Sequence, residues 1–200
     1  MRVLELGCGT GLFTAAFAQT GAQIVAIDLS EQLLEQARQR DLPPSQVEFQ
    51  CGRFEDLPLE AAFDAVIGSS VLHHLELGSA LPRIFELLKP GGRLSFAEPN
   101  LLNPQVFLER YARFLKRLFP YVSPDETAFV RWTLAKRLVA LGFVEIRVEP
   151  FDWLHPRTPR WAMKMVRLAG GAFERVPGVR EFAGSLLITA HRPMSDRRSD

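Results

Sequence analysis

Hydrophobic and polar positions follow two recurring patterns along the chain. Short apolar runs predict buried strands, and the stretches between them, with apolar residues at helical spacing, predict helices. The strands are expected near 3–6, 23–28, 47–51, 63–69 and 93–98, and the helices near 11–20, 30–40 and 79–88. Because strands that alternate with helices are typical of a parallel sheet, we expect an α/β fold.

The pattern changes after residue 100. Ser123 and Glu126 form a capping box with Pro124 at the first helical position, so we expect a helix that runs from there to Leu141. Residues 143–148 and 184–191 are predicted to form the last two strands. We interpret residues 1–193 as one domain with helical inserts at about 101–122 and 153–182, followed by a disordered tail at 194–200.

A glycine-rich turn follows the first predicted strand. Gly7, Gly9 and Gly11 stand at alternate positions, where glycine lets backbone approach a ligand without Cβ clashes. The dinucleotide fingerprint Gly-x-Gly-x-x-Gly would need glycine at position 12, which is Leu12. The spacing therefore disfavours a pyrophosphate cofactor. Taken alone, such a turn is more often an ordinary structural feature.

A carboxylate closes the second predicted strand. Asp28 comes 21 residues after Gly7, and an acid that binds ribose is expected at about 20. At the carboxyl end of its strand it would point into the same crevice as the turn and accept hydrogen bonds from both ribose hydroxyls. The combination of turn, helix and acid predicts a nucleoside site.

Four ordered motifs resemble those of class I S-adenosylmethionine-dependent methyltransferases of the ubiquinone-biosynthesis-like type, with a type-11 methyltransferase domain. They are residues 5–11, Asp28, residues 63–67 and residues 88–94. The resemblance covers residues 1–100 and, less closely, the final helix and strands. It implies a Rossmann-like, seven-stranded, mostly parallel sheet with helices on both faces and the last strand antiparallel at the edge.

The resemblance also implies S-adenosylmethionine as the cofactor, with its methionine end in the first loop and its ribose on Asp28. The implied cofactor contacts are Glu5, Gly7, Gly9, Gly11, Asp28, Leu29, Phe54 and Ser69. Many relatives have an acid where this chain has Arg53. Since arginine cannot accept a hydrogen bond from the adenine amino group, the backbone of Phe54 or Glu55 would have to substitute. Alternatively, Arg53 is a solvated loop residue.

Residues 69–75 follow the fourth strand, at the expected reacting end of the cofactor. His73 or His74 is a candidate general base for a hydroxyl group, or one of them only packs near the cofactor. Glu98 ends the fifth strand and is a candidate for orienting a substrate or accepting its proton, or it binds neighbouring loop amides. No metal site is expected, because the strand ends carry no acidic cluster with metal-ligand spacing.

The same segment lacks the Asn/Asp-Pro-Pro-aromatic motif of enzymes that methylate planar amide or adenine nitrogen. We therefore expect methyl transfer to oxygen, or less readily to carbon or an amine. The acceptor would be a small molecule or a lipid- or glycan-linked one.

Charge differs between the two halves of the chain. Residues 1–100 carry 7 Lys+Arg and 13 Asp+Glu, whereas residues 101–200 carry 17 and 10. Both inserts mix basic and apolar residues at helical spacing. These faces either cover the crevice or dock at a membrane interface as a peripheral contact. No recognisable module suggests nucleic-acid binding, the least favoured reading.

Two further expectations concern the cellular compartment of the protein and the point at which the chain begins. The two cysteines have no metal-ligand spacing, and no signal peptide or long apolar run is found, which favours the cytoplasm. The chain begins two residues before the first strand, where relatives usually carry a helical segment. An alternative to the enzyme is therefore a truncated, non-catalytic module that binds S-adenosylmethionine or a partner.

Overall fold

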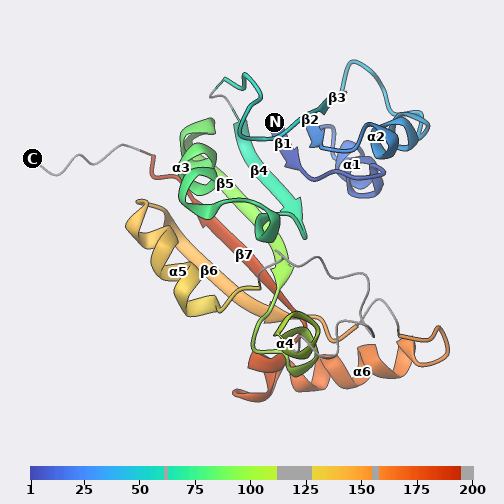
Figure 1. The fold of residues 1–200 in the computed structure, drawn as a ribbon, viewed down its shortest axis with the longest axis vertical. Helices are drawn as coiled ribbons and strands as arrows, with labels where there is room; N and C mark the ends of the chain where they lie inside the picture. Colours follow the sequence, from blue (N-terminus) through green and yellow to red (C-terminus); the bar gives the residue numbers. More distant parts are fainter. Residues whose placement is uncertain (61–62, 112–127, 155–157, 195–200) are drawn as a thin grey trace, which may run out of the picture.

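A seven-stranded sheet in the order β3-β2-β1-β4-β5-β7-β6 forms the centre of the molecule (Figure 1). The computed structural model describes residues 1–60, 63–111, 128–154 and 158–194 of the 200-residue chain. The strands are β1 (Arg2–Leu6), β2 (Gln23–Asp28), β3 (Val47–Cys51), β4 (Phe63–Ser69), β5 (Leu88–Pro99), β6 (Val144–Phe151) and β7 (Ser185–His191). The prediction of a Rossmann-like, mostly parallel α/β sheet is confirmed.

Six strands of the sheet, β1 to β6, run in one direction, and β7 runs in the opposite direction. It is antiparallel to both β5 and β6, whereas β1 to β5 pair in parallel. The expected antiparallel last strand is therefore confirmed. It lies one place in from the edge, because β6 pairs along its outer side.

Helices cover both faces of the sheet, as the resemblance implies. Successive residues of a strand point to opposite faces. In β1, Leu4 and Leu6 join a core that includes residues of α3 (Leu77–Leu87) and α5 (Arg131–Ala140). Val3 joins a smaller core on the other face, which includes residues of α1 (Leu12–Ala18) and α2 (Glu31–Arg38). The apolar alternation thus builds two cores around one sheet.

Helix α5 begins later than the sequence predicts. Its N-cap is Val130, and the preceding Phe129 is paired with the chain beyond β5. The N–H of Phe129 donates to Pro99 O at 3.1 Å, and the N–H of Leu101 donates to Phe129 O at 2.9 Å. The expectation of an unbroken helix from Pro124 is wrong, because this pairing and the burial of Phe129 favour extended backbone.

The two inserts contain short helices at one end of the molecule, beyond the carboxyl end of β5 (Figure 1). They are α4 (Pro104–Tyr111) and α6 (Met163–Phe173), and α6 is followed by the 3₁₀ helix η3 (Val179–Phe182). The predicted capping box, the rest of the first insert and most of the predicted tail lie outside the described residues. The domain limits therefore stay a prediction.

Asn100 connects β5 to η3 and should matter for stability. Its side chain is buried, and Nδ2 donates to the carbonyls of Glu181 and Ala183, each at 2.8 Å. We expect Asn100→Ala to lower the free energy of unfolding by about 2–3 kcal/mol, since two carbonyls lose their donor. Urea denaturation measures the change.

Asn103 provides the matched control. Its exposed Nδ2 donates to Phe182 O at 2.7 Å, and its Oδ1 accepts from the first turn of α4. Asn103→Ala should cost only about 1 kcal/mol, the usual loss of a helix cap. Equal losses for the two variants would contradict the role assigned to burial at Asn100.

Candidate active site

The glycine turn between β1 and α1 is closed on the protein side and open on the other. Gly7 and Gly9 have φ values of +66° and +52°, which side chains rarely adopt. A Cβ on Gly7 would lie 2.9 Å from Cγ2 of Val71, so this part of the turn packs against the loop after β4. A Cβ on Gly9 would meet nothing within 4 Å. Backbone at Gly9 is therefore accessible to a ligand.

Asp28 holds this turn from the end of β2. Its Oδ2 accepts the N–H of Gly9 at 2.7 Å, and its Oδ1 accepts the N–H of Ser30 at 2.9 Å. The side chain is half-buried. A carboxylate oxygen can accept two hydrogen bonds, so each oxygen keeps one acceptor position beyond its backbone partner. Asp28 can support the turn and bind a pair of hydroxyl groups at once.

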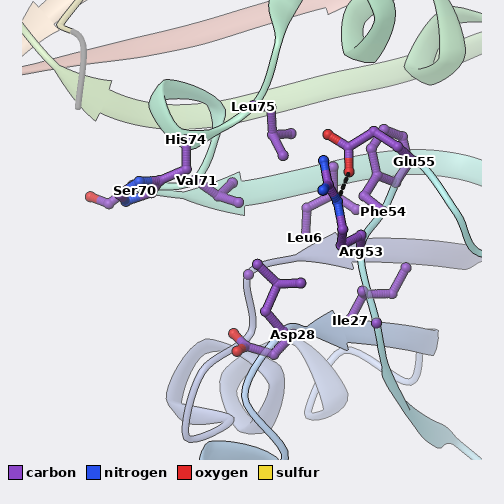
Figure 2. A pocket seen from close by; sticks show the side chains of 13 residues that line it. Leu6, Ile27, Asp28, Arg53, Phe54, Glu55, Ser70, Val71, His74 and Leu75 are labelled. Carbon is purple, nitrogen blue, oxygen red and sulfur yellow. Dashed lines mark ion pairs between the residues drawn. The ribbon is translucent and has the colours of Figure 1, made fainter. Parts of the chain in front are cut away.

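A cavity of about 480 Å³ lies beside Asp28, and we call it the Asp28 cavity (Figure 2). It is lined by Leu6, Gly7, Ile27, Asp28, Leu29, Gly52, Arg53, Phe54, Glu55, Ser70, Val71, His74 and Leu75. These residues come from the ends of β1, β2 and β3 and from the loop after β4. The lining combines apolar side chains with two carboxylates, Asp28 and Glu55, and the latter pairs with Arg53. An apolar lining with a few polar groups suits a nucleoside.

A second cavity of about 410 Å³ lies around Glu5, and we call it the Glu5 cavity. Gly7 and Ser70 line both cavities, so the two meet at this pair. Phe13 and Phe17 of α1 form part of the second lining, together with Ser69 and residues of β5 and β7. The two cavities are thus adjacent, with Gly7 and Ser70 between them.

Glu5 is a buried acid at the second cavity. Only 3% of the residue is exposed, and Thr14 Oγ1 donates to its Oε2 at 2.6 Å. Burial raises the pKa of Glu5 to about 7, while the hydrogen bond from Thr14 opposes the rise. Its charge near neutrality therefore depends on what occupies the cavity, and a cation would favour the carboxylate.

Glu98 accepts hydrogen bonds from the loop after β4, which lies between the two cavities. Its Oε1 accepts the N–H groups of Val71 and Leu72 at 2.9 and 2.8 Å, and its Oε2 lies 2.7 Å from Nδ1 of His73. Glu98 is only 1% exposed, and His73 is buried in the 3₁₀ helix η1 (Leu72–His74). The same loop contains Ser70, whose φ of +54° is rare for a residue with a side chain.

The far rim of the Asp28 cavity is formed by the segment after β3. Phe54 is buried in the core, and the guanidinium of Arg83 lies over its ring at 5.3 Å. Arg53 is at the surface and pairs with Glu55 and Asp56 at 3.8 and 3.7 Å (Figure 2). The arginine side chain is thus directed along the rim by its acidic neighbours.

The structure separates the residues named from the sequence into three groups. Gly7, Asp28, Leu29, Phe54 and His74 line the Asp28 cavity, and Glu5, Gly7 and Ser69 line the Glu5 cavity. Gly9 and Gly11 are in the turn but line neither cavity. His73 and Glu98 also line neither, because both are buried: His73 lies within the loop after β4, and Glu98 of β5 accepts hydrogen bonds from that loop.

Ser70, Val71 and Leu75 belong to the segment 69–75 that the sequence places near the cofactor, but the sequence patterns do not single them out as site residues, and neither do they single out the lining residues Leu6, Ile27 and Gly52. Ser70 follows the named Ser69, but no local pattern signals that its φ is positive or that it separates two cavities. Among the described residues, no group of three or more His, Cys, Asp or Glu side chains could hold a metal ion. In the same residues, no helix combines the length and hydropathy needed to cross a bilayer.

Comparison with known proteins identifies a methyltransferase domain in the first half of the chain. Residues 4–96 match the family model described as "Methyltransferase domain". A "Ubiquinone biosynthesis O-methyltransferase" of Xanthomonas campestris pv. campestris (strain B100) is 38% identical over 141 residues. That match covers 64% of this chain and 59% of the relative. The chain thus spans less than two thirds of the length of the curated relatives it matches.

Solved structures share the fold. An S-adenosylmethionine-dependent methyltransferase from Mesorhizobium loti has a TM-score of 0.67 at 22% identity, over 96% of this chain and 90% of that one. A phosphoethanolamine N-methyltransferase 2 from Haemonchus contortus, in complex with S-adenosyl-L-methionine, has a TM-score of 0.67 at 18% identity. It is matched over 96% of this chain and 49% of that one. These structures confirm the fold, and the resemblance stated from the motifs is supported by the match of residues 4–96 and by the 38% identical relative.

Glu5 should make the stability of the ligand-free protein depend on pH. Its pKa is about 7 in the folded state and near 4.5 without burial, so the folded state binds more protons between these values. Stability therefore falls as pH rises through this window, by about 3 kcal/mol in all. Glu5→Gln should abolish this loss, giving a larger gain over the parent at alkaline than at acidic pH in urea denaturation.

Thr14→Val tests the same carboxyl group from its partner. Removing the hydrogen bond that lowers the pKa of Glu5 should extend the pH-dependent loss of stability to higher pH. If Glu5→Gln changed stability equally across the pH range, the ionisation assigned to Glu5 would be wrong.

Glu98→Ala should release the loop after β4. Two buried backbone N–H groups lose their acceptor, which should cost about 2–4 kcal/mol of unfolding free energy. Hydrogen exchange at the amides of Val71 and Leu72 should also become faster. Glu76→Ala is the matched control, since Glu76 accepts the N–H groups of Gly78 and Ser79 but is exposed. A cost for Glu98→Ala no greater than that of the control would refute this assignment.

Proposed function

Since residues 4–96 match a methyltransferase domain, we propose that this protein transfers a methyl group from S-adenosylmethionine to an oxygen atom of its acceptor. The acceptor class is a small molecule or a lipid- or glycan-linked molecule. Support for oxygen comes from the relatives named as O-methyltransferases. The absence of Asn/Asp-Pro-Pro-aromatic in residues 69–75 adds to it. Nothing in the comparisons supports a non-catalytic binding module.

The observation that carries the proposal is the position of Asp28 at the glycine turn. Its two oxygens each accept one backbone N–H and keep one acceptor position, which fits the two hydroxyls of a ribose. The adenine ring would then lie against the apolar lining of the Asp28 cavity, where Leu6, Phe54 and Leu75 contribute.

The Glu5 cavity would receive the methionine end of the cofactor, beyond Gly7 and Ser70. Glu5 faces this cavity, and its carboxylate form would be favoured beside a positively charged group. S-adenosylmethionine supplies an activated methyl group on a sulfonium. The main contribution of the chain is therefore alignment of the two reactants, for which effective molarities of about 10⁵–10⁸ M are known.

The three residues proposed from the sequence for catalysis take different roles. Glu98 and His73 are positioning residues, because Glu98 accepts the N–H of Val71 and contacts Nδ1 of His73, and these contacts keep the loop after β4 in place. His74 lines the Asp28 cavity and is the proposed acceptor for the proton of a hydroxyl group. Peripheral contact with a membrane, through the basic amphipathic inserts, completes the proposal.

Asp28→Ala should weaken the affinity for S-adenosylhomocysteine by about 10–100-fold, the loss of one or two charge-assisted hydrogen bonds. Because Asp28 also supports the turn, the contact with ribose is isolated with the 2′-deoxy analogue. The parent should prefer the ribose form, and Asp28→Ala should bind both forms alike. Isothermal titration calorimetry measures both affinities.

Asp64→Ala is the matched control for Asp28. Asp64 in β4 also accepts a backbone N–H, from Arg2, and it pairs with Lys89. It does not line either cavity. Its removal should leave the preference for ribose unchanged. If Asp28→Ala kept the parent's preference, the ribose assignment would fail.

The reaction itself is tested by transfer of a labelled methyl group from S-adenosylmethionine into hydroxyl-bearing and amine-bearing acceptors from aqueous and organic cell extracts. We expect label in hydroxyl acceptors, with the linkage identified by mass spectrometry. Tight cofactor binding with no label in any fraction would overturn the enzymatic proposal, and label on nitrogen alone would overturn the choice of oxygen.

A further inference from the structure

Helix α6 presents apolar side chains on two opposite faces. The inward face is packed, since a Cβ on the buried Gly170 would lie 2.9 Å from Cδ1 of Trp153. Phe173 also meets Trp153, with ring centroids 5.3 Å apart. The packing of the helix on the rest of the molecule is therefore accounted for by one face.

The outward face carries three large apolar side chains. Trp161 is 78% exposed, Met165 68% and Leu168 80%, and we call these three the α6 stripe. Their spacing of four and three residues places them in one row along the helix and the turn before it. Exposed apolar residues are ordinary when scattered singly, whereas a row of three large ones marks an interaction surface.

Basic residues flank the α6 stripe. Arg160, Lys164 and Arg167 are exposed, and helical spacing places all three along the same side of the row. Residues 153–182 carry 6 Lys+Arg and 2 Asp+Glu. One of the acids, Glu174, lies after the end of α6, is exposed and accepts the N–H of Asp152 at 3.0 Å. Within residues 160–173, the helix and the turn before it carry these three basic residues and no acidic one.

We propose that the α6 stripe docks this protein on the surface of an anionic lipid bilayer. Tryptophan and aliphatic side chains in a row enter the headgroup boundary, and flanking Lys and Arg pair with anionic lipids. A second protein or a second copy of the chain would need a complementary acidic surface. A bilayer supplies apolar depth and negative charge together.

The location of α6 connects docking to the reaction, and this step rests on the proposed function. Phe151 and Asp152 line the Glu5 cavity, and the chain continues from them through Trp153 towards α6. In Figure 1, α6 lies at one end of the molecule, beyond the end of β5. A bilayer at the α6 stripe would lie near the site, so an acceptor that partitions into lipid could reach it without crossing water.

The test is flotation of the full chain with vesicles. The parent should float with phosphatidylcholine vesicles that contain phosphatidylglycerol, float less as salt is raised, and stay in solution with phosphatidylcholine alone. For the triple variant Trp161→Ser, Met165→Ser, Leu168→Ser, the partition coefficient onto these vesicles should fall by about tenfold or more. The double variant Lys164→Glu, Arg167→Glu should float no better with vesicles that contain phosphatidylglycerol than with phosphatidylcholine alone.

Helix α5 offers matched control variants, because Trp132 and Val139 are exposed apolar residues and Lys136 is an exposed basic one. Trp132→Ser with Val139→Ser, and Lys136→Glu, should float as the parent does. Calorimetry with S-adenosylhomocysteine should give the parent's affinity for every variant, so a failure of docking is distinguished from a failure of the cofactor site.

Three results would overturn the proposal. The parent could remain in solution with anionic vesicles, or the triple variant could float as well as the parent. Light scattering could instead show a dimer that the triple variant abolishes, with no vesicle binding, which would assign the α6 stripe to a second copy of the chain.

Discussion

Carboxylates at strand ends hold the loops from which the site is built. Asp28 accepts the N–H of Gly9 at the end of β2, and Glu98 accepts those of Val71 and Leu72 at the end of β5. Both loops bend away from the sheet ladder, so their N–H groups need other acceptors. Gly7 and Val71 belong to these two loops, and a Cβ on Gly7 would lie 2.9 Å from Cγ2 of Val71, so the two supported loops pack against each other.

The two carboxylates differ in how far they are used. Glu98 is almost fully buried, and both of its oxygens have hydrogen-bond partners in the loop after β4, so its role is structural support for that loop. Asp28 is half-buried and keeps acceptor positions towards its cavity. Glu5 is a third case, because burial raises its pKa to about 7 and its charge responds to the contents of the Glu5 cavity. Residues of one chemical type therefore differ in burial and in the acceptor positions that they leave open towards a cavity.

Elements after β5 lie outside the part of the chain that the family model matches. The family model ends at residue 96, and α4, α5 and α6 lie beyond it. Phe129 pairs beside Asn100 and delays the start of α5, while Asn100 also binds the carbonyls that precede β7. These contacts join the second half of the chain to the end of the sheet where the cavities are. The outward row on α6 lies at the same end of the molecule (Figure 1).

The sequence by itself determined the strands, the alternation of helices and the order of the motifs, because apolar periodicity and glycine spacing are local properties. It also indicated the pairing of Asp28 with the glycine turn, since parallel strands bring their carboxyl ends to one edge. Only the tertiary structure decided that Glu98 accepts hydrogen bonds from the loop after β4 and contacts His73 within it. It also decided that Ser70 lines both cavities and that α5 starts at Arg131. Each of these follows from contacts between residues distant in the chain, such as Phe129 with Pro99. Local sequence patterns do not specify which distant residue a given group will contact.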